Sequence, residues 1–207
     1  MTGQVPSPAM TTTVRPVRPD EFLRVGYLTL QAYDAVGTID GPYRRDLADT
    51  AGRVADGAKV LVAVTWDDQV AGSVTYVDQA NPHFENRGAG DCGFRMLAVD
   101  PAAQGQGTGR LLVQACIDQA RSDHNRRLAI YSMIWMRAAH QLYASLGFIR
   151  RPDRDVTFPA GIGWAFQRDL IADADRHFDP VGTVGNPPPW YEDAWREQGQ
   201  AVDRPVC

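Results

Sequence analysis

Residues 92–120 read CGFRMLAVDPAAQGQGTGRLLVQACIDQA, and this stretch decides the fold. The first eight residues, 92–99, are almost continuously apolar, which predicts a strand buried on both faces. Apolar residues then recur at helical spacing over 109–120, and a glycine-rich turn, 101–109, separates the two elements. In this order the loop amides and the helix N-terminus converge on one point. The stretch therefore predicts an anion-binding concavity.

The loop sequence QGQGTG, residues 104–109, suits a diphosphate ligand. A side chain at the glycine positions would hold the phosphates away from the backbone amides. The simpler alternative is a tight turn that starts a helix. A Rossmann loop is excluded because Arg110 stands where GxGxxG needs glycine, and a P-loop because the Gly-Lys-Ser/Thr ending is missing.

The rest of the chain alternates strand and helix patterns around this unit. β-prone or alternating runs predict further strands at 12–17, 59–66, 70–77, 127–133, 148–156 and 162–167, and helical spacing predicts helices at 21–33, 43–55 and 137–146. We therefore expect an α/β (α+β) fold with a mixed, mostly antiparallel, twisted sheet of six to seven strands and about four helices. We expect residues 12–170 to form this single domain, residues 1–11 to be a flexible leader and residues 171–207 to be a C-terminal extension.

Length and composition limit the function classes. A chain of 207 residues with 44% hydrophobic residues can bury one substantial core. The net charge of −4 argues against nucleic-acid binding, and no apolar run is long enough to span a membrane. Cys92, Cys116 and Cys207 lack metal-site or disulfide spacing, which predicts free thiols, a reducing cytoplasmic location and no metal.

Three motifs occur in a defined order: FRMLAVDP at residues 94–101, Gln104-x-x-Gly107-x-Gly109, and LYASLGF at residues 142–148. In order and spacing they resemble the GNAT superfamily of acyl-CoA-dependent N-acetyltransferases, over residues 59–167. The resemblance implies a V-shaped splay between the fourth and fifth strands, 92–99 and 127–133. It also implies acetyl-CoA, or coenzyme A, as the co-substrate in that splay.

The resemblance further implies which residues hold the cofactor. The backbone of 97–99 would pair with the pantetheine arm, and the amides of 105–110 would hold the pyrophosphate. The expected cofactor-binding residues are Leu97, Ala98, Val99, Gln104, Gly105, Gln106, Gly107, Thr108, Gly109 and Arg110.

Acetyl transfer to an amine needs oxyanion stabilisation and protonation of the leaving thiolate. The resemblance gives the first task to the backbone N–H of Leu97 and the second to Tyr143, whose alternative interpretation is a core aromatic.

A base must also accept the proton of the amine. Many relatives carry glutamate on the fourth strand at the position of Gly93, so the base has to come from elsewhere. Glu85 is the favoured candidate, and His83 and Asp91 are the alternatives.

These features predict an N-acetyltransferase that acts on a primary amine, of a small molecule or of a protein lysine or N-terminus, by direct attack in a ternary complex. The alternative is a non-catalytic acyl-CoA-binding sensor or interaction module. The extension carries Trp190, Tyr191 and Trp195, which could pack on a partner subunit in a homodimer, cover the acceptor cleft or remain disordered.

Overall fold

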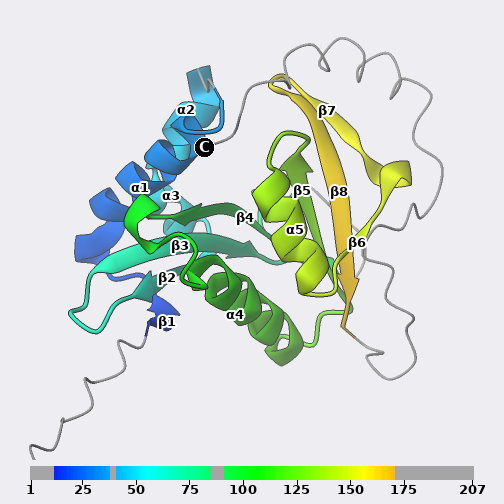
Figure 1. Ribbon diagram of the computed structural model, residues 1–207. Helices are drawn as coiled ribbons and strands as arrows, with labels where there is room; N and C mark the ends of the chain where they lie inside the picture. Colours follow the sequence, from blue (N-terminus) through cyan, green and yellow to red (C-terminus); the bar gives the residue numbers. More distant parts are fainter. Residues whose placement is uncertain (1–11, 38–40, 85–90, 171–207) are drawn as a thin grey trace, which may run out of the picture.

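The computed structural model describes residues 12–37, 41–84 and 91–170 (Figure 1). The expected leader and C-terminal extension lie outside these residues. Eight strands form one sheet in the order β1-β2-β3-β4-β5-β8-β6, and β7 pairs with β8. The strands are β1 (Thr13–Pro16), β2 (Lys59–Val64), β3 (Val70–Val77), β4 (Asp91–Val99), β5 (Arg127–Met133), β6 (Ile149–Arg150), β7 (Val156–Phe158) and β8 (Gly161–Asp169). The α-helices are α1 (Phe22–Asp34), α2 (Gly41–Ala48), α3 (Thr50–Ala55), α4 (Thr108–Ser122) and α5 (Arg137–Ser145).

The sheet is antiparallel apart from one pair. Within the described strands only β4 and β5 run parallel, and α4 makes the crossover between them. A parallel neighbour needs such a crossover, whereas β2 and β3 are joined by a short turn. The mixed, mostly antiparallel fold expected from the sequence is confirmed.

Helices cover both faces of the sheet, as the alternation along β2 shows. Leu61 and Ala63 join the core beneath α4 and α5, while Val60, Val62 and Val64 join the core beneath α1. Figure 1 shows α1, α2 and α3 together, apart from α4 and α5. Covering both faces buries the central strands β2, β3 and β4.

Two elements expected from the sequence are each interrupted at one point in the structure. The helix expected at 43–55 is α2 followed by α3, because the Asp49 side chain accepts a hydrogen bond from the Gly52 amide at 2.7 Å and starts a new helix. The strand expected at 148–156 is interrupted by a 3-10 turn at Pro152–Arg154, which separates β6 from β7. This break accounts for the eighth strand.

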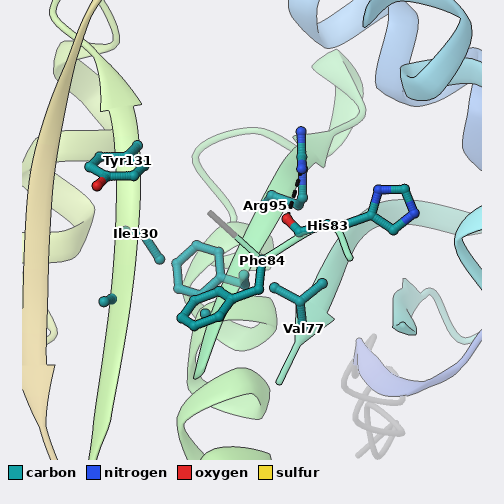
Figure 2. A pocket seen from close by; sticks show the side chains of 9 residues that line it. Val77, His83, Phe84, Arg95, Ile130 and Tyr131 are labelled. Atoms are coloured by element: carbon teal, nitrogen blue, oxygen red, sulfur yellow. Dashed lines mark hydrogen bonds between the residues drawn. The ribbon is translucent and has the colours of Figure 1, made fainter. Parts of the chain in front are cut away.

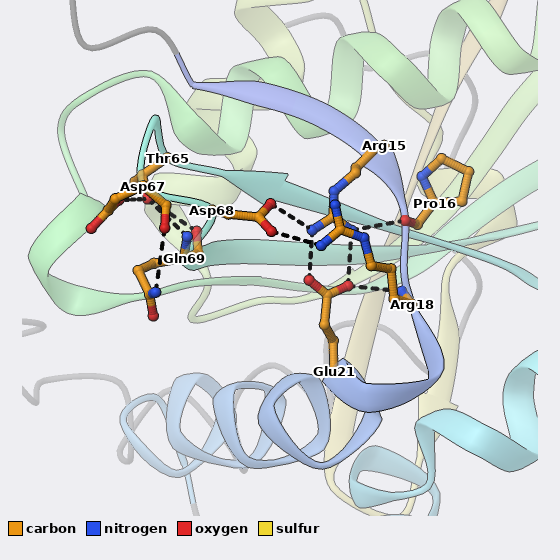
Figure 3. A network of polar contacts seen from close by, with 8 residues as sticks. All are labelled: Arg15, Pro16, Arg18, Glu21, Thr65, Asp67, Asp68 and Gln69. Atoms are coloured by element: carbon orange, nitrogen blue, oxygen red, sulfur yellow. Dashed lines mark hydrogen bonds and ion pairs between the residues drawn. The ribbon is translucent and has the colours of Figure 1, made fainter.

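A polar network fixes the entry into α1 (Figure 3). Arg15 on β1 bonds both oxygens of Glu21 at 2.9 and 2.6 Å and also reaches Asp68 in the β2–β3 turn at 3.0 Å. Arg18 bonds the same Asp68 at 2.6 Å, and its amide donates to Glu21. The network ties the first strand, the start of α1 and the β2–β3 turn together.

Among the helices that the structure describes, none combines the length and the hydropathy needed to cross a bilayer.

Candidate active site

β4 and β5 form a fork. They pair at Asp91 with Arg127 and at Cys92 with Leu128, and the register contains no further pair, although β4 continues to Val99 and β5 to Met133. On its other edge β5 is paired with β8 along its whole length. The expected splay between these strands is therefore confirmed. Unpaired strand edges inside a protein need hydrogen-bond partners, so the fork can receive an amide-containing chain.

A β-bulge lies on the β4 side of the fork. Thr75 of β3 stands opposite Arg95 and Ser73 opposite Ala98, so two residues of β4, Met96 and Leu97, face one residue of β3. Met96 has φ of 54° although it is not glycine, and it is only 2% exposed. Such strain gathers at functional sites. The sequence did not reveal the bulge, because methionine carries no signal for a left-handed backbone.

The glycine loop is open towards the outside of the fold. Gly105 and Gly107 have φ of 73° and 85°, and a Cβ at either would meet no atom within 4 Å. Gly107 is the N-cap of α4, and no side chain caps the helix. Inward, Thr108 bonds the Ala103 carbonyl at 3.2 Å. An uncapped N-terminus of a long helix, with free space in front of it, fits the expected diphosphate group.

Tyr143 lies on α5 within an aromatic cluster. Its ring centroid is 5.7 Å from Phe94, 5.8 Å from Phe148 and 5.7 Å from Phe166, and the residue is 5% exposed. Burial raises the pKa of its phenol above the ordinary value. Tyr143 is therefore a core aromatic by packing, and its hydroxyl stays protonated at neutral pH. A core aromatic can also carry a hydroxyl that donates a proton, so the two interpretations of Tyr143 from the sequence, core residue and acid, do not exclude each other.

Gly93 lies where the fork opens, and it has no room for a side chain. A Cβ there would be 2.5 Å from the Ala129 carbonyl oxygen and 2.9 Å from the ring of Phe84. A small pocket in this region is lined by Val77, Phe84, Arg95, Ile130 and Tyr131, among others (Figure 2). None of its described lining residues is a carboxylate. The Phe84 ring thus lies against Gly93, at the position where the fork opens.

The three base candidates are placed differently. Glu85 lies outside the described residues. His83 is one of the pocket-lining residues, but its ring points away from the fork in Figure 2 and its Nε2 lies 2.9 Å from Asp56 Oδ2. Asp91 is fully buried, and its Oδ1 accepts a hydrogen bond from Arg127 Nε at 2.7 Å. Neither His83 nor Asp91 presents its side chain to the pocket as described.

The face of the fork beneath α1 and α2 carries aromatic residues and arginine. Tyr33 and Tyr43 meet edge to face at 6.3 Å, and the Arg95 guanidinium lies 5.7 Å from the Tyr43 ring centroid. Burial, and then the nearby Tyr43 and Tyr143, raise the pKa of Tyr33. The sequence analysis did not predict Tyr33 or Tyr43, because their spacing marks only helix positions. No group of three potential metal ligands occurs among the described residues.

Known proteins are similar to this chain in sequence profile and in fold. The acetyltransferase (GNAT) family profile matches residues 26–148. Similar solved structures include a GCN5-related N-acetyltransferase from Kribbella flavida, with 22% identity, TM-score 0.61 and coverage of 77% of this chain and 98% of that one.

Two further structures are similar. The putative acetyltransferase yncA from Salmonella typhimurium, solved with its cofactor acetyl-CoA, has 22% identity and TM-score 0.56. The match covers 81% of this chain and 98% of that one. A ribosomal-protein-alanine N-acetyltransferase from Brucella melitensis has 21% identity and TM-score 0.58, and the match covers 76% of this chain and 99% of that one. Comparison with curated proteins finds no match.

At these identities the solved structures establish the fold alone. The family profile goes further, because it spans more than half of the chain and includes both the fork and the glycine loop. By its sequence profile, and in agreement with its fold, the chain belongs to the acetyltransferase (GNAT) family.

Proposed function

We propose that this protein is an N-acetyltransferase that moves an acetyl group from acetyl-CoA to a primary amine, by direct attack in a ternary complex. The amine belongs to a small molecule or to a protein lysine or N-terminus. The observation that carries the proposal is the fork: β4 and β5 separate beyond Cys92 and Leu128, directly before the open glycine loop at the start of α4.

The proposed cofactor site follows the free edge of β4 into the loop. The backbone of Leu97, Ala98 and Val99 offers hydrogen bonds to the pantetheine amides. Gln104, Gly105, Gln106, Gly107, Thr108, Gly109 and Arg110 surround the pyrophosphate. The open space at Gly105 and Gly107 supports this placement, because a Cβ at either position would meet no atom within 4 Å.

Two groups serve the chemistry of the thioester. The amide of Leu97, in the bulge, is the proposed hydrogen-bond donor to the developing oxyanion. Tyr143 is the proposed acid for the leaving thiolate. Its raised pKa keeps the hydroxyl protonated, so the group is a donor at neutral pH, although a weak one. We expect it to orient the sulfur as much as to protonate it.

Glu85 remains the proposed general base. The described pocket supports a base outside the strands, because Gly93 has no space for the glutamate of many relatives and the side chains of His83 and Asp91 are engaged by Asp56 and Arg127. A base on the β3–β4 loop would act directly or through one water.

The two cysteines in the described part of the chain support direct attack. Cys92 and Cys116 are buried, and burial raises the pKa of Cys92 to about 12 and that of Cys116 well above its ordinary value. Neutral buried thiols are poor nucleophiles. Mass spectrometry of the protein after incubation with acetyl-CoA and no amine should show no acetyl adduct. A stoichiometric adduct would contradict the direct mechanism.

The second candidate is a non-catalytic acyl-CoA-binding module, favoured by the closed position at Gly93 and by the absence of a carboxylate among the described pocket residues. Calorimetric titration with CoA, beside thiol release from acetyl-CoA with a panel of amines, separates the two. Binding with amine-dependent release supports the enzyme, and binding without release supports the module. Failure to bind CoA contradicts both.

A further inference from the structure

Ser132 carries a buried hydroxyl on the part of β5 that has no pair with β4. The residue is 5% exposed. It pairs with Trp164 of β8, which packs against the core beneath α4 and α5, and Leu128 and Ile130 of β5 belong to the same core. Side chains two residues apart along a strand lie on one face of the sheet. The Ser132 side chain therefore lies on the face of the fork that α4 and α5 cover.

This hydroxyl stands level with the bulge of β4. The last pair between the two strands joins Cys92 with Leu128, and four residues further along each strand bring β4 to Met96 and β5 to Ser132. Parallel strands run in step from a shared pair, so these two residues stand at the same height on opposite sides of the fork. The amide of Leu97, the proposed oxyanion donor, belongs to the same bulge. Ser132 thus stands at the height proposed for the thioester.

The Ser132 hydroxyl has a sulfur atom as its acceptor. Among the described residues it donates to the Met136 sulfur, at 3.6 Å, in the residue that precedes α5. A thioether is a weak acceptor. The simpler explanation is a structural contact that joins the end of β5 to the start of α5. Such a contact is readily exchanged, because a charged acceptor forms a much stronger hydrogen bond.

We propose that Ser132 is a further catalytic residue, whose hydroxyl turns from Met136 and donates a hydrogen bond to the sulfur of coenzyme A as it leaves. This rests on the proposed transferase function. As the carbon–sulfur bond breaks, its electron pair passes to the sulfur, which becomes a thiolate. Ser132 keeps its own proton and stabilises this charge, and protonation of the sulfur stays with Tyr143.

Two donors divide this work. Tyr143 packs against Phe166, which is the β8 partner of Ile130, two residues closer to the base of the fork than Ser132. Burial raises the pKa of the Tyr143 phenol, so the phenol is a weak acid. A thiolate with this donor alone would form in largely apolar surroundings, where an unpaired charge is costly. A hydroxyl that can rotate, at the height of the bulge, lowers this cost as the charge develops.

Calorimetric binding of CoA and of desulfo-CoA, in which hydrogen replaces the thiol, tests the contact without turnover. At about pH 9 a thiol with a pKa near 8.5 is mostly ionised. We expect Ser132→Ala to weaken CoA binding about tenfold, because it removes a hydrogen bond to a charged sulfur, and to leave the binding of desulfo-CoA unchanged. Ser132→Thr keeps the hydroxyl and should retain the wild-type preference for CoA.

Steady-state kinetics give a second readout. Ser132→Ala should lower kcat about tenfold with little change in KM for acetyl-CoA, because the neutral sulfur of the thioester is a poor acceptor before the bond breaks. Thr29→Val is the matched control, since it removes another buried hydroxyl, which donates to the Val25 carbonyl within α1 at 2.8 Å, on the opposite face of the sheet. It should keep the wild-type kcat and the wild-type preference for CoA over desulfo-CoA.

The outcomes separate this inference from the proposed function. Equal loss of CoA and desulfo-CoA affinity in Ser132→Ala, or no loss of either, overturns the Ser132 contact, while amine-dependent thiol release by the wild type leaves the transferase intact. Failure of the wild type to bind CoA, or to transfer acetyl to any amine, overturns both. If Ser132→Ala fails to fold, Ser132→Cys, whose thiol is a weaker donor, gives the same comparison. A wild-type preference for CoA in that variant contradicts the proposal.

Discussion

The carbonyl oxygen of Ala129 on β5 lies 2.5 Å from the point where a Cβ on Gly93 of β4 would sit. The two strands are therefore still close together where they begin to diverge, and the Phe84 ring lies against the same position. Glycine at this position sets the width of the fork at its base. A glutamate cannot enter without moving a strand.

Replacing Gly93 with alanine should destabilise the protein, because the new methyl group meets backbone that cannot rotate away. We expect the free energy of unfolding, measured by urea denaturation, to fall by about 1–3 kcal/mol. Gly37→Ala is the control, since a Cβ there would meet Trp135 only at an ordinary 3.8 Å. Equal stability of the wild type and Gly93→Ala would show that the fork can widen.

Tyr143→Phe should slow acetyl transfer and leave the fold intact. The ring keeps its contacts with Phe94, Phe148 and Phe166, so the unfolding midpoint should change little. Loss of the hydroxyl should reduce kcat by about 10- to 100-fold, at the lower end of general-acid effects. Steady-state kinetics with saturating acetyl-CoA measure this change. An unchanged kcat would make Tyr143 a packing residue alone.

Gly107→Ala should weaken CoA binding. The residue has φ of 85° at the start of α4, so alanine strains the backbone and places a methyl group in the space proposed for phosphate. We expect the CoA dissociation constant to rise by about tenfold or more in calorimetry. Gly41→Ala, with φ of 69° and equally open surroundings, is the matched control for strain. Similar losses in both variants would contradict a phosphate site at Gly107.

The network at the start of α1 predicts loss of stability in acid. The hydrogen bond from Arg15 lowers the pKa of Glu21 below its ordinary value of 4.5. A carboxyl group with a lowered folded pKa contributes stability above its unfolded pKa, and this contribution is lost as the pH falls through the folded value.

Thermal unfolding should therefore show a decline below about pH 4.5 that Glu21→Gln reduces, with lower stability of the variant at neutral pH. Asp34→Asn, which removes an exposed ion pair with Arg44, is the control and should behave like wild type. A Glu21→Gln variant with the full acid decline would refute the role of this network.

Much of the fold could be predicted from residue patterns. The β-branched run at 70–77 and the run at 127–133 are strands with the bounds expected, since continuous apolar character and flanking turn residues define their ends. The breaks were missed because each depends on a single residue: Asp49 caps a new helix, and Pro152 begins a turn.

The site, like the fold, could be predicted only in part from the sequence. The loop from Gln104 to Gly109 was predictable because a left-handed backbone demands glycine. The bulge at Met96 and the close approach of the Ala129 carbonyl to Gly93 were not, because each arises from contacts between strands that are distant in sequence. Sequence patterns report local backbone needs, whereas the shape of the fork depends on tertiary packing.

Amine-dependent release of CoA from acetyl-CoA, followed with a thiol reagent and with mass spectrometry of the product, tests the central claim most directly. The account predicts release that requires both protein and amine, with an acetylated amine formed in equal amount. Tight binding of acetyl-CoA without release across a broad amine panel would contradict it, and would leave the fork and glycine loop as a binding module.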